Sequence, residues 1–153
     1  MIRKVVCQNR KVSYDYSIDE TLEAGIVLLG PEVKSLRQGR SSLGDSYARV
    51  KQGEVFVFNM HITPYVNAGT HVQLDPTRTR KLLLNRKEIK RLIGKTEEKG
   101  YSLIPTKAYF TDKGHAKLEL ALAKGKKKYD KRRALKEKDL KKEIEHARKR
   151  RDY

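Results

Sequence analysis

A chain of 153 residues with a formal net charge of +17 is long enough for one domain plus an appendage, and it predicts a polyanionic partner. Nucleic acid is the leading interpretation of that partner, with an anionic membrane surface as the alternative. One cysteine excludes an internal disulfide framework, and neither a membrane-spanning apolar run nor a signal peptide is present, so we expect a cytoplasmic protein.

The first third of the chain has a β-like pattern from Tyr14 to Leu36. An aliphatic run at residues 26–29 lies between Gly25 and the pair Gly30-Pro31, and alternation resumes over residues 32–37. We therefore expect strands on both sides of a bend at the proline.

Residues 47–60 predict a β-hairpin whose turn falls at residues 51–53. The second arm has apolar side chains on both faces, with Val55 and Val57 on one and Phe56, Phe58 and Met60 on the other. This pattern favours a central strand that is covered on both sides.

A long loop follows over residues 64–80, because prolines and a glycine interrupt it without periodicity. Its basic end, residues 75–81, is expected to be exposed.

The clearest helix begins at Asn85, which can cap it, and is expected to end before Gly100. Its apolar face carries Ile89, Leu92 and Ile93. The opposite face fits either a solvated surface or an RNA-facing one, and carries Arg86, Lys87, Lys90, Arg91 and Lys95.

Residues 101–110 and 115–123 predict a last hairpin. Three leucines at positions 118, 120 and 122 share one face of its second arm, so Lys117 is expected on the opposite face. Pro105 indicates an edge or a bulge in the first arm. About six antiparallel strands with one sizeable helix predict a mainly β protein with a small closed or partly open barrel and a few flanking helices.

Residues 124–153 differ in kind from residues 1–123. They hold fifteen Lys and Arg against six Asp and Glu, a net +9, and the preceding domain has a net +8. Their composition favours a helix, but Leu140, Ile144 and Ala147 are too few to offset the entropy of ordering thirty residues. We predict an arm that is disordered alone and helical on its target.

Enzyme signatures are missing from the sequence. Four scattered histidines and one cysteine give no zinc spacing, and no phosphate-binding glycine loop or nucleophile elbow is present. We expect no catalytic activity, metal or cofactor, with a nuclease built from His61 or His71 and Asp75 as a minor alternative.

Cations lie beside tyrosines, a mixture that favours RNA, because cations hold the phosphates while aromatic rings stack on unpaired bases. Arg10 and Lys11 lie near Tyr14 and Tyr16, and Lys126 to Lys128 precede Tyr129.

Several strings of residues together resemble the small protein B (SmpB) family, which binds transfer-messenger RNA (SsrA RNA) in bacterial ribosome rescue. The resemblance covers nearly the whole chain. It runs through Asn9-Arg-Lys11, Glu23-Ala-Gly25, Glu32-Val-Lys-Ser-Leu-Arg37, Asp45-Ser-Tyr47, Asp75-Pro-Thr-Arg-Thr-Arg-Lys-Leu-Leu-Leu-Asn85, Ala123-Lys-Gly-Lys-Lys127 and Asp130-Lys-Arg132.

This resemblance implies an oligonucleotide-binding (OB)-like barrel that grips the tRNA-like domain of the RNA. The family's RNA-binding positions match Asn9, Glu23, Leu83 and Lys117, with Arg10 and Lys11 as basic neighbours. A carboxylate such as Glu23 can accept hydrogen bonds from base amino groups, although without the resemblance it reads as a surface glutamate paired with a cation. Leu83 fits an apolar contact better than a polar one.

The resemblance also implies that the C-terminal arm enters the mRNA path of a stalled ribosome and probes the empty decoding site. Elongation factor Tu is an implied partner in the delivered complex. Tyr129 stands where some relatives have histidine, so a role that needs imidazole donors is in doubt. The matching residues are Lys124, Gly125, Lys126, Lys127, Tyr129, Asp130, Lys131 and Arg132.

The leading hypothesis is therefore a non-enzymatic adaptor that brings transfer-messenger RNA to stalled ribosomes. The alternative is a general RNA chaperone that uses the same barrel without a dedicated RNA.

Overall fold

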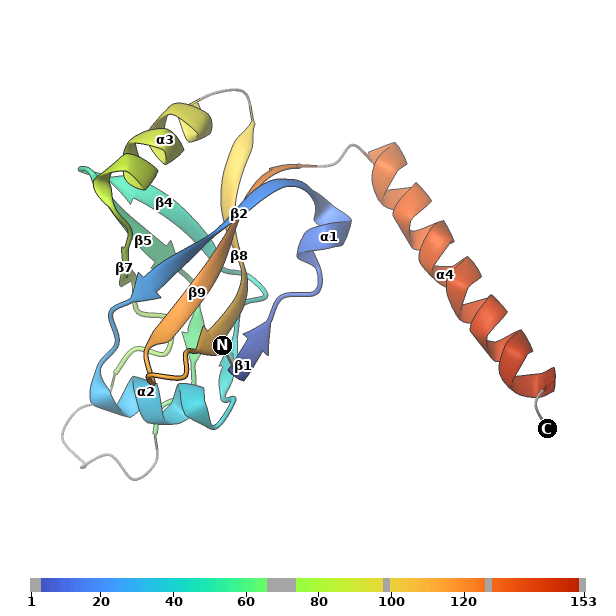
Figure 1. Ribbon diagram of the computed structural model, residues 1–153, viewed down its shortest axis with the longest axis horizontal. Helices are drawn as coiled ribbons and strands as arrows, with labels where there is room; N and C mark the ends of the chain where they lie inside the picture. The colour runs from blue at the N-terminus through green and yellow to red at the C-terminus, as the bar shows by residue number, and fades with distance from the viewer. Residues whose placement is uncertain (1–3, 66–73, 98–99, 126–127, 152–153) are drawn as a thin grey trace.

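The structure is a computed structural model that describes residues 4–65, 74–97, 100–125 and 128–151. Nine strands and four helices lie within these residues (Figure 1). In chain order they are β1 (Lys4–Gln8), α1 (Val12–Asp15), β2 (Tyr16–Ile26), α2 (Gly30–Arg37), β3 (Ser41–Ser42), β4 (Tyr47–Lys51), β5 (Glu54–Phe58), β6 (His61–Ile62), β7 (Arg80–Leu83), α3 (Arg86–Glu97), β8 (Tyr101–Phe110), β9 (Ala116–Gly125) and α4 (Lys128–Arg151).

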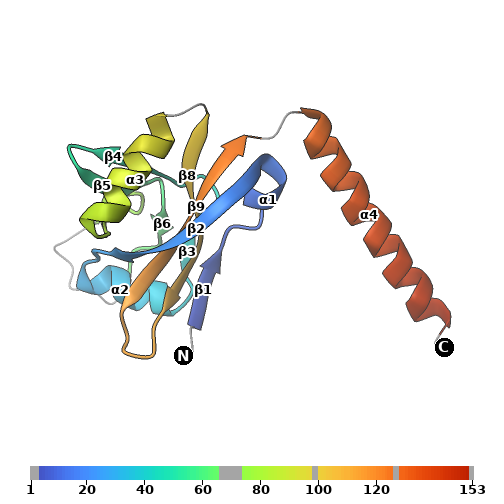
Figure 2. The same ribbon diagram turned by 45° about the horizontal axis from the view of Figure 1, so that its top comes forward.

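Six antiparallel strands close into a ring in the order β8-β4-β5-β7-β2-β9, because β9 pairs with β8 as well as with β2. Strand β1 adds to the second half of β8, while β3 and β6 form a separate pair. The expected mainly β barrel with flanking helices is confirmed. The turned view in Figure 2 shows α2 and α3 near opposite ends of the ring.

The interior of the ring is filled by alternate side chains of the strands. Leu118, Leu120 and Leu122 of β9 are all fully buried, so the predicted leucine face is the inward one. On β5 the inward residues are Val55 and Val57, also fully buried. Because side chains alternate along a strand, the positions between these point outward, and Glu119 and Phe56 among them are partly exposed.

The β4–β5 hairpin confirms the hairpin predicted over residues 47–60. Its second strand ends at Phe58, and Met60 lies in the core instead of on the outer face, because Asn59 at positive φ breaks the alternation. The hairpin turn has both central residues, Gln52 and Gly53, at positive φ, the conformation whose twist matches that of the strands it joins. On the outer face, the rings of Tyr47 and Phe58 stack with centroids 5.2 Å apart. The outer face of β5, with Phe56 and Phe58, is only half-buried, so the prediction of a strand covered on both sides is wrong for this face.

Helix α3 also confirms its prediction. The Oδ1 atom of Asn85 accepts a hydrogen bond from the backbone N–H of Glu88 at 2.9 Å, and Gly100 has the positive φ of a helix stop. Leu92 is buried against the barrel core.

Residues 30–37 form helix α2, so the alternating strand predicted over residues 32–37 is wrong. Pro31 lies in the first turn, where a missing N–H costs nothing, and the Glu32 carboxylate accepts a hydrogen bond from the Leu29 N–H at 2.9 Å. Glu32 and Leu36 are buried at i, i+4 spacing, which fits a helix as well as the short alternation fits a strand.

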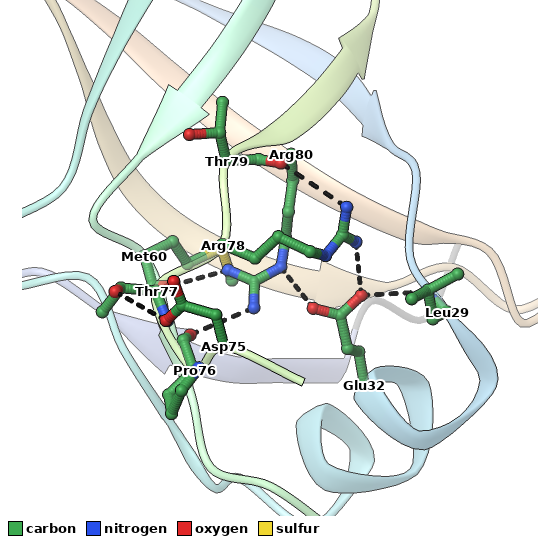
Figure 3. Close-up of polar contacts among 9 residues, drawn as sticks. All are labelled: Leu29, Glu32, Met60, Asp75, Pro76, Thr77, Arg78, Thr79 and Arg80. Carbon is green, nitrogen blue, oxygen red and sulfur yellow. Dashed lines mark hydrogen bonds and ion pairs between the residues drawn. The ribbon is translucent and has the colours of Figure 1, made fainter. Parts of the chain in front are cut away.

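The basic end of the long loop is not wholly exposed, contrary to expectation, because Arg80 is completely buried. Its guanidinium donates to Glu32 and to the carbonyl oxygens of Met60 and Pro76, as Figure 3 shows. Arg78 donates to the other oxygen of Glu32 at 2.6 Å. This cluster ties α2 to the start of β7 and to the loop before it.

The arm is a single helix, α4, that extends away from the barrel in both ribbon views. It touches the body at α1, where the Lys138 ammonium lies 4.6 Å from the ring centroid of Tyr14. Strand β9 reaches Gly125, two residues beyond the predicted domain boundary. None of the described helices has the length and apolar character that crossing a membrane requires.

Candidate nucleic-acid interface

Three of the predicted RNA-binding side chains converge on the outer face of the ring around Gly25 in β2. This glycine pairs with Leu83 of β7 on one side and with Lys117 of β9 on the other. A Cβ atom at Gly25 would lie 3.2 Å from Leu83 Cβ and 3.7 Å from Lys117 Nζ. Glu23, two residues earlier on the same strand, shares this face. We call Glu23, Gly25, Leu83 and Lys117 the outer-face site.

The outer-face site combines three kinds of chemistry on three neighbouring strands. Leu83 is an apolar side chain that is 54% exposed. Lys117 projects from the side opposite the leucine row, as predicted, and among the described residues it makes no ion pair. An unpaired ammonium beside an exposed leucine and a carboxylate can meet a phosphate, an apolar surface and an amino group together.

Tyr109 of β8 is a member of this neighbourhood that the sequence prediction missed. Its side chain is 1% exposed, and its hydroxyl donates a hydrogen bond to Oε2 of Glu23. In register it pairs with Lys117, so it reaches Glu23 across β9. The predicted hairpin held a signal that could have found it, because pairing its two arms back from the turn sets Tyr109 opposite Lys117.

Asn9, Arg10 and Lys11 lie elsewhere, between β1 and α1. The side-chain nitrogen of Asn9 donates to the carbonyl oxygens of Leu43 at 3.1 Å and Pro105 at 3.5 Å. Its oxygen accepts the Lys11 N–H at 3.2 Å. Asn9 therefore holds this turn in place, while Arg10 and Lys11 are exposed.

A groove with aromatic walls adjoins this turn. Two hollows of about 480 and 260 Å³ share the lining residues Tyr16, Tyr47 and Ile104. Lys11 lines one hollow, and Arg49 lines the other. Lys11 and Tyr16, which lie near each other in the sequence, thus line the same hollow, whereas the contribution of Tyr47 comes from a distant strand and was not foreseen.

The residues predicted for the decoding-site arm are divided between the barrel and α4. Lys124 and Gly125 belong to β9, and the Lys124 ammonium lies 4.5 Å from the ring centroid of Tyr101. Arg132 is exposed on α4. Lys126 and Lys127 lie outside the described residues. The backbone of Tyr129, Asp130 and Lys131 is part of α4, and their side chains also lie outside the described set.

The nuclease alternative gains no support from the described part of the chain. His61 lies in β6, His71 falls outside the described residues, and Asp75 accepts two hydrogen bonds from Thr77. Within the same residues, no group of three or more histidine, cysteine or acidic side chains is placed to hold a metal ion.

The fold and its surfaces place this chain in a class of proteins: basic β-barrels that have exposed cations and a helical arm. The family model described as "SmpB protein" matches residues 6–150. The chain belongs to this family.

Named relatives agree with the family match. SsrA-binding proteins of Listeria welshimeri and Geobacillus thermodenitrificans are 56% and 57% identical over 144 residues, which is 94% of this chain and 92% of each relative. That of Macrococcus caseolyticus is 57% identical over 148 residues, covering 97% and 95%. A chain in the solved structure "tmRNA-SmpB: a journey to the center of the bacterial ribosome" is 47% identical, with a TM-score of 0.66 over 84% of this chain and 92% of that one.

Proposed function

We propose that this protein is a non-enzymatic adaptor that binds the tRNA-like domain of transfer-messenger RNA and delivers it to stalled ribosomes. The observation that carries the proposal is the convergence of Glu23, Leu83 and Lys117 around Gly25. These are the positions that the family resemblance implies for RNA binding, and they come from three different strands. Relatives named SsrA-binding proteins, identical at more than half of the aligned positions, support the choice of RNA.

Each side chain of the outer-face site has a distinct part in this proposal. Lys117 neutralises a phosphate, and the counterion it releases makes binding dependent on salt. Glu23 accepts a hydrogen bond from a base amino group. A surface of cations alone has no acceptor and could not recognise that group. Leu83 packs against the apolar face of a ribose or base. The body thereby distinguishes a folded RNA from bulk polyanion.

The arm carries out the second step of the proposed function, which takes place on the ribosome. Lys124 to Arg132 would occupy the decoding site where codon–anticodon pairing is absent, and α4 would follow the empty mRNA channel. Its three exposed large aliphatic side chains, Leu135, Leu140 and Ile144, support a partner beyond the barrel, because in this structure they remain exposed. Elongation factor Tu would accompany the complex during delivery.

The test separates the two parts by truncation after Gly125, the last residue of β9. Among the residues whose side chains the structure describes, none of the hydrophobic core cluster lies beyond Leu122, so the barrel is expected to keep its fold. The truncated chain should bind the tRNA-like domain with the affinity of the full chain and should fail to support tagging of peptides on stalled ribosomes. A loss of RNA binding on truncation would contradict this division.

A competition experiment separates the adaptor from a general RNA chaperone. Binding of labelled tRNA-like domain is measured with a large excess of bulk tRNA, for the full chain and for Lys117→Gln. An adaptor keeps its RNA under competition, and the substitution makes it lose that RNA. A chaperone releases the RNA in both cases.

A further inference from the structure

The outer-face site depends on two residues that do not themselves have the chemistry to read RNA. We propose that Tyr109 and Gly25 are its positioning residues: Tyr109 fixes the carboxylate of Glu23, and Gly25 leaves the space that the Lys117 ammonium and Leu83 occupy. This inference rests on the proposed RNA-binding function of the site and adds the means by which the site is preorganised.

Tyr109 is suited to hold Glu23 because its own side chain is packed inside the protein. Its side chain is almost fully buried, yet it lies outside the main core cluster, on the outward side of β8. The neighbouring residues Ala108 and Phe110 face the core instead. A buried hydroxyl must find an acceptor, and the acceptor here is Glu23, on a strand that does not pair with β8. Tyr109 thus links β8 to β2 over the intervening β9.

The consequence for Glu23 is a defined orientation on an exposed surface. A free glutamate has several rotamers, and ordering them on binding would weaken the affinity. A carboxylate has two oxygens with about four lone-pair sites, so it can accept from an RNA amino group while it accepts from Tyr109. Holding the carboxylate in advance shifts that entropic cost from the binding step to folding.

Gly25 acts through the space it leaves. Its φ lies outside the left-handed range, so alanine would be compatible with its backbone conformation. The obstacle is the 3.2 Å between the added Cβ and Leu83 Cβ, since both atoms are fixed to paired strands. An alanine would push β7 away or displace Leu83, and its methyl would also meet Lys117 Nζ. The absence of a side chain at Gly25 therefore allows Leu83 of β7 and Lys117 of β9 to approach each other over β2.

Together these residues determine which kind of nucleotide the outer-face site can bind. A fixed acceptor, a cation and an exposed apolar side chain suit a nucleotide that presents a base amino group beside a phosphate. Four strands contribute to the arrangement, namely β2, β7, β8 and β9. Motion of one strand alone would misalign the three chemical groups.

The first experiment is a double-mutant cycle in the full chain, with Tyr109→Phe, Glu23→Gln and both together. The readouts are the Kd for tRNA-like-domain RNA at one salt concentration and the thermal unfolding midpoint of each variant. We expect Tyr109→Phe to weaken binding about threefold to tenfold, as for the cost of ordering one side chain during binding. In the Glu23→Gln background the same change should have little further effect.

Additive losses in that cycle would overturn the proposal, because Tyr109 would then act independently of Glu23. Equal affinity of Tyr109→Phe and the wild-type chain, with Glu23→Gln weakened, would overturn it too while leaving the proposed function intact. Unchanged binding by Glu23→Gln would remove Glu23 from the proposed site itself, and with it the role given to Tyr109.

The second experiment compares Gly25→Ala with Gly94→Ala, a matched control in α3 where an added Cβ meets no atom within 4 Å. Gly25→Ala should weaken RNA binding about tenfold, because the tight contact with Leu83 Cβ displaces the leucine or its strand from the site. Gly94→Ala should leave the affinity unchanged. The same affinity in Gly25→Ala as in the wild-type chain would overturn the role of Gly25. The cycle at Tyr109 remains decisive if Gly25→Ala does not fold.

Discussion

Arg80 and Glu32 form an ion pair inside the protein, with 2.6 Å between the arginine Nε and a carboxylate oxygen and both side chains almost fully withdrawn from solvent. The partners are 48 positions apart in the sequence, and they join the first turn of α2 to the first residue of β7. The arginine belongs to the basic string that most clearly carries the family resemblance. Its role in this structure is to stabilise the fold, although its charge alone predicts a nucleic-acid contact.

Breaking this pair should destabilise the protein strongly. Arg80→Met removes the hydrogen bonds of the guanidinium to Glu32 and to two backbone carbonyls, while Arg78 still donates to Glu32. We therefore expect a loss of about 3 kcal/mol in the free energy of unfolding, the low end of the range for a broken buried pair. The measurement is urea denaturation. Lys81→Met is the matched control, since its ion pair with Glu54 is exposed and should contribute less than about 1 kcal/mol. Similar losses in both variants would contradict the prediction.

The same pair predicts a dependence of stability on pH. Burial raises the pKa of Glu32, but hydrogen bonds from Arg78, the Leu29 N–H and Arg80 outweigh it and hold the pKa below its usual 4.5. A folded-state pKa below the unfolded one gives stability that is full above about pH 4.5 and lost as the pH falls through the folded value. Unfolding free energies between about pH 6 and 3 should therefore fall more steeply in the wild-type chain than in Glu32→Gln. Parallel curves would show that Glu32 is not responsible.

Lys117 should contribute one phosphate contact to RNA binding. Lys117→Gln is expected to weaken binding and to reduce the slope of log Kd against log salt by about 0.7–0.9, the share of one released counterion. Lys51→Gln is a suitable control, because it removes the same charge from the β4–β5 turn, across the ring from β9. Equal slopes for the two variants would mean that Lys117 contributes only to the general field of the protein.

The arm should be unfolded when it is separated from its target. A peptide of residues 124–153 is expected to show little helix by circular dichroism, because the aliphatic side chains of α4 are exposed and a high net charge opposes compaction. Binding to ribosomes with an empty decoding site should increase its helix content. A strongly helical free peptide would instead indicate that composition alone orders the segment.

Sequence reasoning predicted the elements whose pattern was long or whose turn chemistry was explicit. The β4–β5 hairpin, α3 with its Asn85 cap and the outward position of Lys117 are confirmed. Each of these depends on neighbours within a few residues, so local periodicity was sufficient. The candidate site was reached through the family resemblance and the strand pattern together.

The features that sequence reasoning missed depend on contacts between distant residues. Residues 30–37 are too few to separate a helix from an alternating strand, and the deciding partner, Arg80, comes from another element. The basic composition of residues 75–81 gives no sign that Arg80 is buried. Tyr109 likewise acquires its role from a strand that it does not pair with, since its acceptor is Glu23 on β2.

The arm leaves the barrel almost directly from a paired strand, since only residues 126 and 127 separate β9 from α4. A helix of 24 residues spans about 36 Å, at 1.5 Å per residue. While the helix persists, α4 therefore acts as a molecular ruler that starts at the barrel. Each residue inserted into it would move the distal end by about 1.5 Å and turn its faces by about 100°. The length of α4 therefore determines where its distal residues lie relative to the barrel, just as its charge determines which surfaces attract it.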